Sequence, residues 1–198
     1  MLSIILCNHK EPGIFNFVHE VESQLPVTEI IISTDSESKG KGWAIREALE
    51  HAKGDKIALL DGDGEIPARM LLRLLPFLTD FDVVVGSKRL HPKSPPRRKI
   101  MTHVTRMWFR LLFGVQVDTQ TGIKLFRREA LESLDWNWES NGFIYDVEVI
   151  SRLQRKGLRI IEVPIECEIR RQLPVKRIFK ILGESLWLKW RLLSPVKS

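Results

Sequence analysis

The chain has 198 residues, a length that suits one domain with a buried core. Its residues are 43% hydrophobic and 28% charged, which indicates a globular protein and excludes a disordered or fibrous one. The net charge of +6 predicts an anionic partner, which charge alone leaves open as nucleic acid, a membrane surface or a phosphorylated substrate.

The first residues carry no basic leader, and no segment approaches the ~20 apolar residues that span a bilayer. We therefore expect neither a signal peptide nor a membrane-spanning helix. The two cysteines, Cys7 and Cys167, lie within apolar runs, which favours buried, reduced thiols. A cytoplasmic protein is expected.

Strand and helix signals alternate through the first half of the chain. Apolar and β-branched runs predict strands at 2–7, 28–34, 56–60 and 81–86, and helical spacing predicts helices at 13–24, 43–52 and 67–78. Such alternation predicts an α/β fold with a mostly parallel sheet and helices on both faces.

The second half is less regular. A Pro-rich basic loop is expected at 92–99, helices at 100–113, 145–155 and 176–193, and strands at 122–126 and 158–170, the last broken by Pro164. The helices at 100–113 and 176–193 combine large apolar residues with lysines and arginines. Both are amphipathic, and either is a candidate for binding a membrane surface; the alternative is that both pack on the sheet.

The segment IALLDGDGEIP runs from a buried strand into three carboxylates, Asp61, Asp63 and Glu65. Carboxylate oxygens are ligands for Mg²⁺ or Mn²⁺, which proteins hold with one or two carboxylates and substrate phosphates. A calcium-binding EF-hand loop is excluded, because Ile66 and Leu72 occupy its required Gly and Glu positions. The alternative is a solvated turn that leads into the next helix.

Ligands in parallel sheets bind at the carboxyl ends of the strands. Three expected loops meet there: 8–11, which includes Asn8 and Glu11, the loop at Asp35, and 61–65. Lys41 belongs to a KGKG segment that precedes a helix, where an ammonium group and backbone N–H groups can meet a phosphate. The alternative for this segment is a flexible basic turn.

Two groups of basic residues lie in the second half. Arg89 precedes the Pro-rich loop, Arg97 and Arg98 lie after its prolines, and Arg170 and Arg171 lie at the end of the last expected strand. Guanidinium groups suit phosphate recognition, although runs of charge are also common on solvated surfaces. The five histidines lack zinc-site spacing, and no G-x-S-x-G motif supports a serine hydrolase.

Four segments in order resemble glycosyltransferase family two, and within it the dolichyl or polyprenyl phosphate mannosyl- and glucosyltransferases. These segments are KGKGWAIREALEHAKGDKIALLDGDGEIP, DVVVGSKRL, DTQTGIKLFRREAL and FIYDVEVISRLQRKGLRIIEVPIE. The resemblance implies a GT-A fold, a nucleotide-diphosphosugar donor of the GDP-mannose or UDP-glucose type, a divalent cation and inverting transfer of a hexose. Only residues 36–39 separate Asp35 from the glycine-rich segment, so the nucleotide-binding half is shorter than in the family.

The resemblance also implies roles for residues. Asp61 and Asp63 match the D-x-D motif that handles the metal and the donor diphosphate, and Glu65 follows them as a third polar ligand. Glu11 and Asp35 match acidic residues on the nucleotide side, and Asp146 and Glu148 match the late acidic motif. On the acceptor side the matching residues are Arg89, Asp118, Thr121 and Gly122, together with Arg170 or Arg171.

The resemblance thus predicts a single GT-A domain over 1–198, with a donor and metal half at 1–90, an acceptor half at 91–175 and a basic amphipathic helix at 176–198. The leading hypothesis is a hexosyltransferase that acts on a polyprenyl phosphate at the cytoplasmic face of a membrane, with no nucleic-acid partner. A lipid monophosphate is already anionic at neutral pH and needs no base.

Two alternatives stay open. One is a soluble glycosyltransferase with a hydroxyl acceptor, in which Asp146 or Glu148 is the base. The other is an inactive relative that binds nucleotide sugars.

Overall fold

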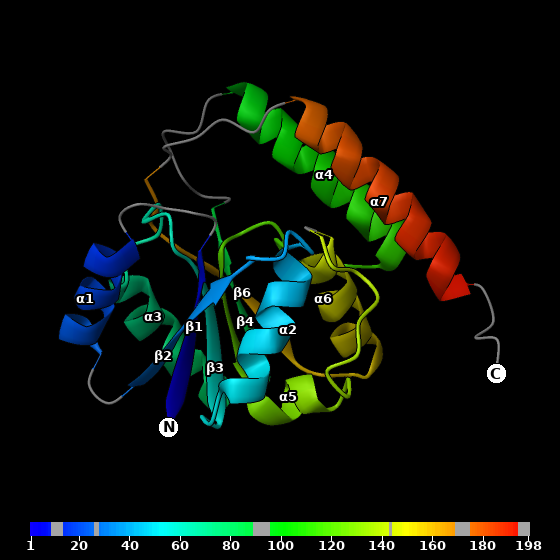
Figure 1. The fold of residues 1–198 in the computed structure, drawn as a ribbon. Helices are drawn as coiled ribbons and strands as arrows, with labels where there is room; N and C mark the ends of the chain where they lie inside the picture. Colours follow the sequence, from blue (N-terminus) through cyan, green and yellow to red (C-terminus); the bar gives the residue numbers. More distant parts are fainter. Residues whose placement is uncertain (9–13, 26–27, 89–95, 143, 169–174, 194–198) are drawn as a thin grey trace.

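The structure is a computed structural model that describes residues 1–8, 14–25, 28–88, 96–142, 144–168 and 175–193. Its centre is one six-stranded sheet with the strand order β2-β1-β3-β5-β4-β6 (Figure 1). The strands are β1 (Leu2–Asn8), β2 (Thr28–Thr34), β3 (Lys56–Asp61), β4 (Val83–Ser87), β5 (Ile123–Arg127) and β6 (Ile160–Pro164). All pairs are parallel except those of β5, which lies antiparallel between β3 and β4.

Helices cover both faces of this sheet, as the sequence predicts (Figure 1). They are α1 (Ile14–Gln24), α2 (Lys41–His51), α3 (Arg69–Leu74), α4 (Pro96–Phe113), α5 (Arg128–Glu132), α6 (Tyr145–Arg155) and α7 (Val175–Leu193), with a 3₁₀ helix η1 (Leu75–Thr79). Neighbouring strand residues face opposite sides of a sheet. Accordingly Ile5 packs in a core with α2 and α6, whereas Ile4 and Leu6 pack in a second core with α1 and α3.

Several boundaries differ from the sequence prediction, and prolines account for three of them. The expected helix at 67–78 divides into α3 and η1 because Pro76 has no N–H to continue the helical ladder. The helix expected from residue 100 starts earlier, at Pro96, since proline suits the first turn of a helix. The expected strand at 158–170 is the short edge strand β6, which ends at Pro164.

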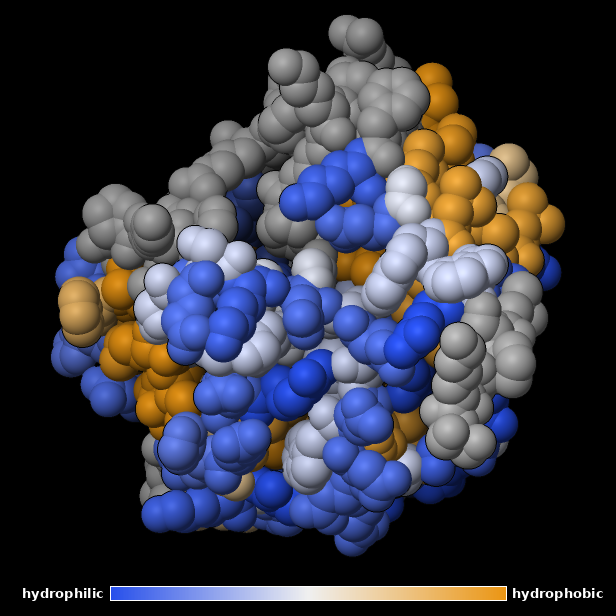
Figure 2. Space-filling view, turned by 45° about the vertical axis from the view of Figure 1, so that its right-hand side comes forward, coloured by the Kyte–Doolittle hydropathy of each residue, from blue (hydrophilic) through white to orange (hydrophobic). Residues whose placement is uncertain are grey.

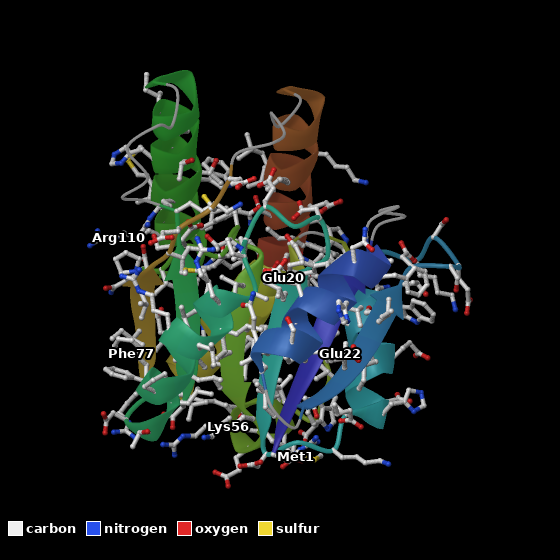
Figure 3. All side chains as sticks on the ribbon, turned by 90° about the vertical axis from the view of Figure 1, so that its left-hand side faces the viewer. Met1, Glu20, Glu22, Lys56, Phe77 and Arg110 are labelled. Atoms are coloured by element: carbon white, nitrogen blue, oxygen red, sulfur yellow. The ribbon has the colours of Figure 1, made fainter. Side chains whose placement is uncertain are left out.

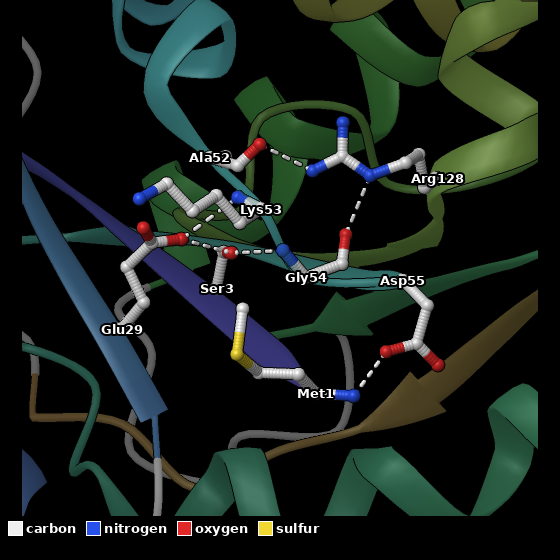
Figure 4. A network of polar contacts seen from close by, with 8 residues as sticks. All are labelled: Met1, Ser3, Glu29, Ala52, Lys53, Gly54, Asp55 and Arg128. Atoms are coloured by element: carbon white, nitrogen blue, oxygen red, sulfur yellow. Dashed lines mark hydrogen bonds and ion pairs between the residues drawn. The ribbon is translucent and has the colours of Figure 1, made fainter.

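A polar network fixes the amino ends of the strands (Figure 4). The buried Ser3 hydroxyl accepts a hydrogen bond from the Gly54 N–H at 2.7 Å and donates one to Glu29 at 2.6 Å. The bond from Ser3 lowers the pKa of Glu29, and a second bond, from the Lys53 N–H to Glu29 at 2.8 Å, lowers it further. Arg128 donates to the backbone carbonyls of Ala52 and Gly54. This edge of the sheet is therefore occupied by structural bonds.

Helices α4 and α7 run side by side (Figures 1 and 3). Met1 and Lys56 lie at one end of the sheet, and the two helices extend past the other end. The Trp108 indole donates to the Ser185 hydroxyl at 2.8 Å, and Lys189 donates to the Leu112 carbonyl at 2.6 Å. None of the helices in the described ranges is long and apolar enough to cross a membrane.

Candidate active site

The acidic corner lies at the carboxyl edge of the sheet, where the sequence places it. Asp61 is the last residue of β3, and its N–H donates to the Gly122 carbonyl at 2.8 Å. The next residue, Gly62, donates its N–H to the Cys7 carbonyl in β1 at 3.0 Å. The neighbouring elements β1 and β5 thus fix the start of the acidic loop.

Lys41 is the first residue of α2, and its ammonium group lies 2.7 Å from Asp61 Oδ1. Burial alone would lower the pKa of Lys41, but the nearby carboxylates, Asp61 first, raise it above its usual value. Burial would likewise raise the pKa of Asp61, and Lys41 holds it below the usual range. Both groups are therefore ionised at neutral pH, and each stabilises the charge of the other.

Gly122 is required at its position by the Asp61 side chain. A Cβ atom there would lie 2.2 Å from Asp61 Oδ2 and 2.5 Å from Asp61 Cγ. The Asp61 carboxylate thus has a fixed position, or seat, between Gly122 and Lys41. Of its side chain, 35% remains exposed. The sequence assigned Gly122 to the acceptor side, and the structure places it directly against the metal-site candidate.

Asp63 and Glu65 have different surroundings. Asp63 Oδ1 accepts the N–H of Glu65 at 3.0 Å, and burial followed by the charges of Asp61 and Glu65 raises the pKa of Asp63. A bound cation would relieve the repulsion between Asp63 and the carboxylates of Asp61 and Glu65. Glu65 forms a largely buried ion pair with Lys88 at 3.0 Å.

Across the described ranges, no three acidic, histidine or cysteine side chains are arranged to hold a metal ion. The structure therefore does not join Glu65 to the two aspartates. Among the described residues, Asp61 and Asp63 remain the candidate donors for Mg²⁺ or Mn²⁺, a cation that proteins hold with one or two carboxylates together with substrate phosphates and water.

Asp35 follows β2 at the same edge. Its Oδ2 accepts the N–H of Gly40 at 2.9 Å, which fixes the turn before α2. Its Oδ1 is buried and accepts no hydrogen bond from the described part of the chain. Buried carboxylate oxygens are normally paired, so this atom is a candidate acceptor for a ligand hydroxyl.

The start of α2 is held by a loop from the second half of the chain. The Asn141 carbonyl accepts the Gly42 N–H at 2.7 Å, and the Trp138 indole donates to the Gly42 carbonyl at 3.2 Å. A Cβ at Gly42 would lie 2.5 Å from the Ser140 carbonyl oxygen. The glycines of the KGKG segment therefore permit a close approach of two backbones, and the role of this segment in phosphate binding stays a prediction.

Asp118 and Thr121 shape the loop before β5. Asp118 Oδ2 accepts the Thr121 hydroxyl at 2.8 Å, and Oδ1 accepts the Gln120 N–H at 3.1 Å. Both side chains are buried. Their observed bonds hold the turn that delivers Gly122 to Asp61.

Asp146 and Glu148 lie on α6 and have separate partners. Asp146 forms a buried ion pair with Lys124 of β5 at 2.8 Å, and Lys124 also donates to the Thr121 carbonyl. Glu148 has no exposed surface; it accepts the N–H groups of Glu139 and Ser140 and pairs with Arg152 at 2.6 Å.

The described geometry thus makes Glu148 the anchor of the loop at 139–142. Asp146 pairs with Lys124 instead, and its charge is among those that raise the pKa values of Lys41 and Cys7.

Sequence reasoning missed Lys124 and Lys88, which carry the charges opposite Asp146 and Glu65. The available signal for Lys124 was a single lysine within the apolar strand IKLF. Cys7 also lies at this edge, and burial, followed by smaller effects of its charged neighbours, raises its pKa to about 12. Its thiol is therefore protonated at neutral pH and is no nucleophile.

Some expected site residues lie outside the described residues: Glu11, Arg89, Arg170 and Arg171. Asn8 ends β1, and Arg97 and Arg98 belong to the first turn of α4, but the side chains of these three are not described. Their assigned roles stay predictions.

Comparison with known proteins finds relatives that are glycosyltransferases. Undecaprenyl-phosphate mannosyltransferase of Micrococcus luteus is 30% identical over 169 residues, which cover 81% of this chain and 69% of that protein. Glycosyltransferase AglD of Haloferax volcanii is 31% identical over 150 residues, 73% of this chain and 24% of that protein. Dolichyl-phosphate beta-glucosyltransferase of Saccharomyces cerevisiae is 27% identical over 149 residues, 66% of this chain and 45% of that protein. The chain thus spans less than half of two of these three relatives.

Solved structures share the fold. Glucosyl-3-phosphoglycerate synthase of Mycobacterium tuberculosis, in complex with UDP, superposes with a TM-score of 0.74 at 18% identity, covering 96% of this chain and 79% of that one. The same enzyme with Mn²⁺, UDP-glucose and phosphoglyceric acid gives a TM-score of 0.72 at 17% identity, covering 94% and 77%. The family model described as glycosyltransferase like family 2 matches residues 3–182, and the chain belongs to this family.

Proposed function

We propose that the chain is an inverting glycosyltransferase that moves a hexose from a nucleotide-diphosphosugar to a polyprenyl phosphate. The observation that carries the proposal is the pair Asp61 and Asp63 at the carboxyl edge of the sheet, beside Lys41 and Asp35, in a chain of this family. Two relatives are named for transfer to undecaprenyl phosphate and to dolichyl phosphate, which supports the acceptor class.

The donor would be bound by residues of the half at 1–90. Asp35 Oδ1 would accept a hydroxyl of the nucleoside, and Lys41 would lie near the diphosphate. Asp61 and Asp63 would hold a divalent cation, which when bound supplies positive charge against the leaving diphosphate. Gly122, which seats Asp61, belongs to the half at 91–175, so the site joins both halves.

The buried carboxylates favour a phosphate acceptor. A hydroxyl acceptor must lose a proton to a base, but Glu148 is wholly buried with both oxygens bonded, and Asp146 is paired with Lys124. A lipid monophosphate attacks as an anion and needs no such base. The alternative, a hydroxyl acceptor, would require Asp146 to leave Lys124.

The membrane surface is proposed to bind α4 and α7. Four exposed residues of α4 share one face at helical spacing, and three further residues of α7 are exposed; they are Ile100, Val104, Met107, Leu111, Leu186, Trp187 and Trp190. Figure 2 shows hydrophobic residues gathered on the upper right of the molecule, on the side of this helix pair. An apolar face on a basic chain is typical of helices that lie in a membrane interface. We place the protein at the cytoplasmic face.

Vesicle flotation tests this surface. The protein should float with anionic vesicles at low salt, and the double change Leu111→Asp and Trp187→Asp should lower the bound fraction about tenfold or more. Leu72→Asp is the matched control, because Leu72 is an exposed leucine on α3. Equal flotation of all three proteins would contradict the assignment.

A transfer assay tests the function itself. The protein is incubated with Mn²⁺, a polyprenyl phosphate and radiolabelled UDP-glucose or GDP-mannose, and label in the organic phase is counted. We expect label with one donor, with a loss of 10²-fold or more in Asp63→Ala. Transfer only to hydroxyl acceptors would favour the alternative, and donor binding without any transfer would indicate an inactive relative.

A further inference from the structure

The Lys41 ammonium group pairs with the Asp61 oxygen that a divalent cation would also bind. Its ammonium group lies 2.7 Å from Asp61 Oδ1, and its side chain is only 20% exposed. The other carboxylate oxygen lies over Gly122, where a Cβ would have no room. A cation that binds Asp61 through Oδ1 must therefore displace the Lys41 ammonium group.

The backbone of Lys41 is fixed, whereas its side chain is flexible and 20% exposed. The Gly40 N–H donates to the Asp35 carboxylate and the Gly42 N–H donates to the Asn141 carbonyl, which holds the first turn of α2 on both sides of Lys41. A lysine has a flexible stem of four carbons, so its ammonium group can shift without movement of the helix. The face of the Tyr145 ring lies beside the ammonium group, with its centroid 6.0 Å from Lys41 Nζ, and it can attract this cation.

We propose that Lys41 is a built-in counter-ion that occupies the Asp61 carboxylate until a divalent cation displaces it. Lys41 thereby lowers the affinity of the site for the cation when no donor is present. This inference rests on the proposed function, since it takes Asp61 as a cation ligand. Once displaced, the ammonium group is available to the donor diphosphate, so that cation and donor bind more tightly together than separately.

The test measures Mn²⁺ binding in the absence of nucleotide. Binding is monitored as the decrease of the free Mn²⁺ signal in electron paramagnetic resonance. Lys41→Met keeps much of the side-chain volume and removes the charge, and we expect it to bind Mn²⁺ about tenfold more tightly than wild type or better. Adding Asp61→Asn to this variant should abolish the gain. Lys53→Met is the control, because it removes the same charge from an exposed site that precedes the amino end of β3.

Equal or weaker Mn²⁺ binding by Lys41→Met would overturn the proposal. Lys41→Gln provides a second measurement if the first variant does not fold, as judged by circular dichroism and thermal melting. A gain that survives Asp61→Asn would also overturn it, because the cation would then not be bound at Asp61.

The same titration with UDP or GDP separates this inference from the proposed function. We expect one nucleotide to tighten Mn²⁺ binding by wild type more than by Lys41→Met, which would support the release of the ammonium group to the diphosphate. If neither nucleotide affects wild type, the proposed donor binding is contradicted, while the competition is still decided by the measurement without nucleotide.

Discussion

Replacing Gly122 with alanine should move the Asp61 carboxylate and little else. The added Cβ would lie 2.2, 2.5 and 2.9 Å from Oδ2, Cγ and Cβ of Asp61, and real Cβ contacts essentially never fall under 3.0 Å. The two shortest contacts are to side-chain atoms of a residue that is 35% exposed, so rotation toward solvent relieves them, and the 2.9 Å contact to Asp61 Cβ needs only a small further shift. Asp61 must therefore shift by about 1 Å, the scale of misplacement that costs ~10²-fold in rate.

The expected cost in stability is small by comparison. Inserting a methyl group into a packed site costs roughly 1–3 kcal/mol, and the open side of Asp61 places Gly122→Ala near the lower end. The Lys41 pair would be strained by the same shift, because Lys41 bonds the displaced carboxylate at 2.7 Å. Activity should thus fall much further than the fraction of folded protein.

Transfer rate, Mn²⁺ affinity and the free energy of unfolding should be measured on Gly122→Ala and on Gly183→Ala. Gly183 is an exposed helical position in α7, where an added Cβ meets nothing within 4 Å, so this control should gain about 0.5–1 kcal/mol in stability and keep its activity. If Gly122→Ala retains transfer and Mn²⁺ binding within about threefold, the fixed seat of Asp61 is not needed and the reasoning fails.

Two further predictions concern stability, measured by urea unfolding. Ser3→Ala should lose about 1–3 kcal/mol because the buried Gly54 N–H loses its acceptor. Since Ser3 lowers the pKa of Glu29, their bond stabilises the fold above the ordinary glutamate pKa and is lost as the pH falls through the lowered one. The difference in the free energy of unfolding between wild type and Ser3→Ala should therefore become smaller in acid. A difference that does not change with pH would contradict this. Lys124→Met should cost about 3–5 kcal/mol because it leaves Asp146 buried and unpaired, and adding Asp146→Asn should recover part of the loss; no recovery would refute the ion-pair account.

The layered fold and the location of the acidic corner follow from local sequence patterns. β-Branched runs alternating with helical spacing predict parallel strands, and the carboxyl-end rule then places Asp61 and Asp35 at one edge. The same patterns carry no information on strand order. The insertion of antiparallel β5 between β3 and β4 depends on pairing between residues far apart in the sequence, and this insertion brings Gly122 to Asp61.

Partners of buried charges were the least predictable feature of the site. Glu148 and Asp146 are two residues apart on one helix, so they face different surroundings: one binds a loop and Arg152, the other Lys124. Motif matching gave both the same role, because it reads residue type and position only. The α4–α7 pairing was likewise unpredictable: Trp108 has the same hydropathy whether it faces α7 or a membrane, and in the structure it bonds Ser185.

The most direct test of the central claim is a crystal structure of the protein with Mn²⁺ and the nucleoside diphosphate that binds it, with the metal located by anomalous scattering. The account predicts one strong peak within about 2.0–2.3 Å of oxygens of Asp61 and Asp63, bridged to the diphosphate, with the Lys41 ammonium group moved off Asp61. A metal bound elsewhere, or a diphosphate bound away from this edge while Lys41 still pairs with Asp61, would contradict it.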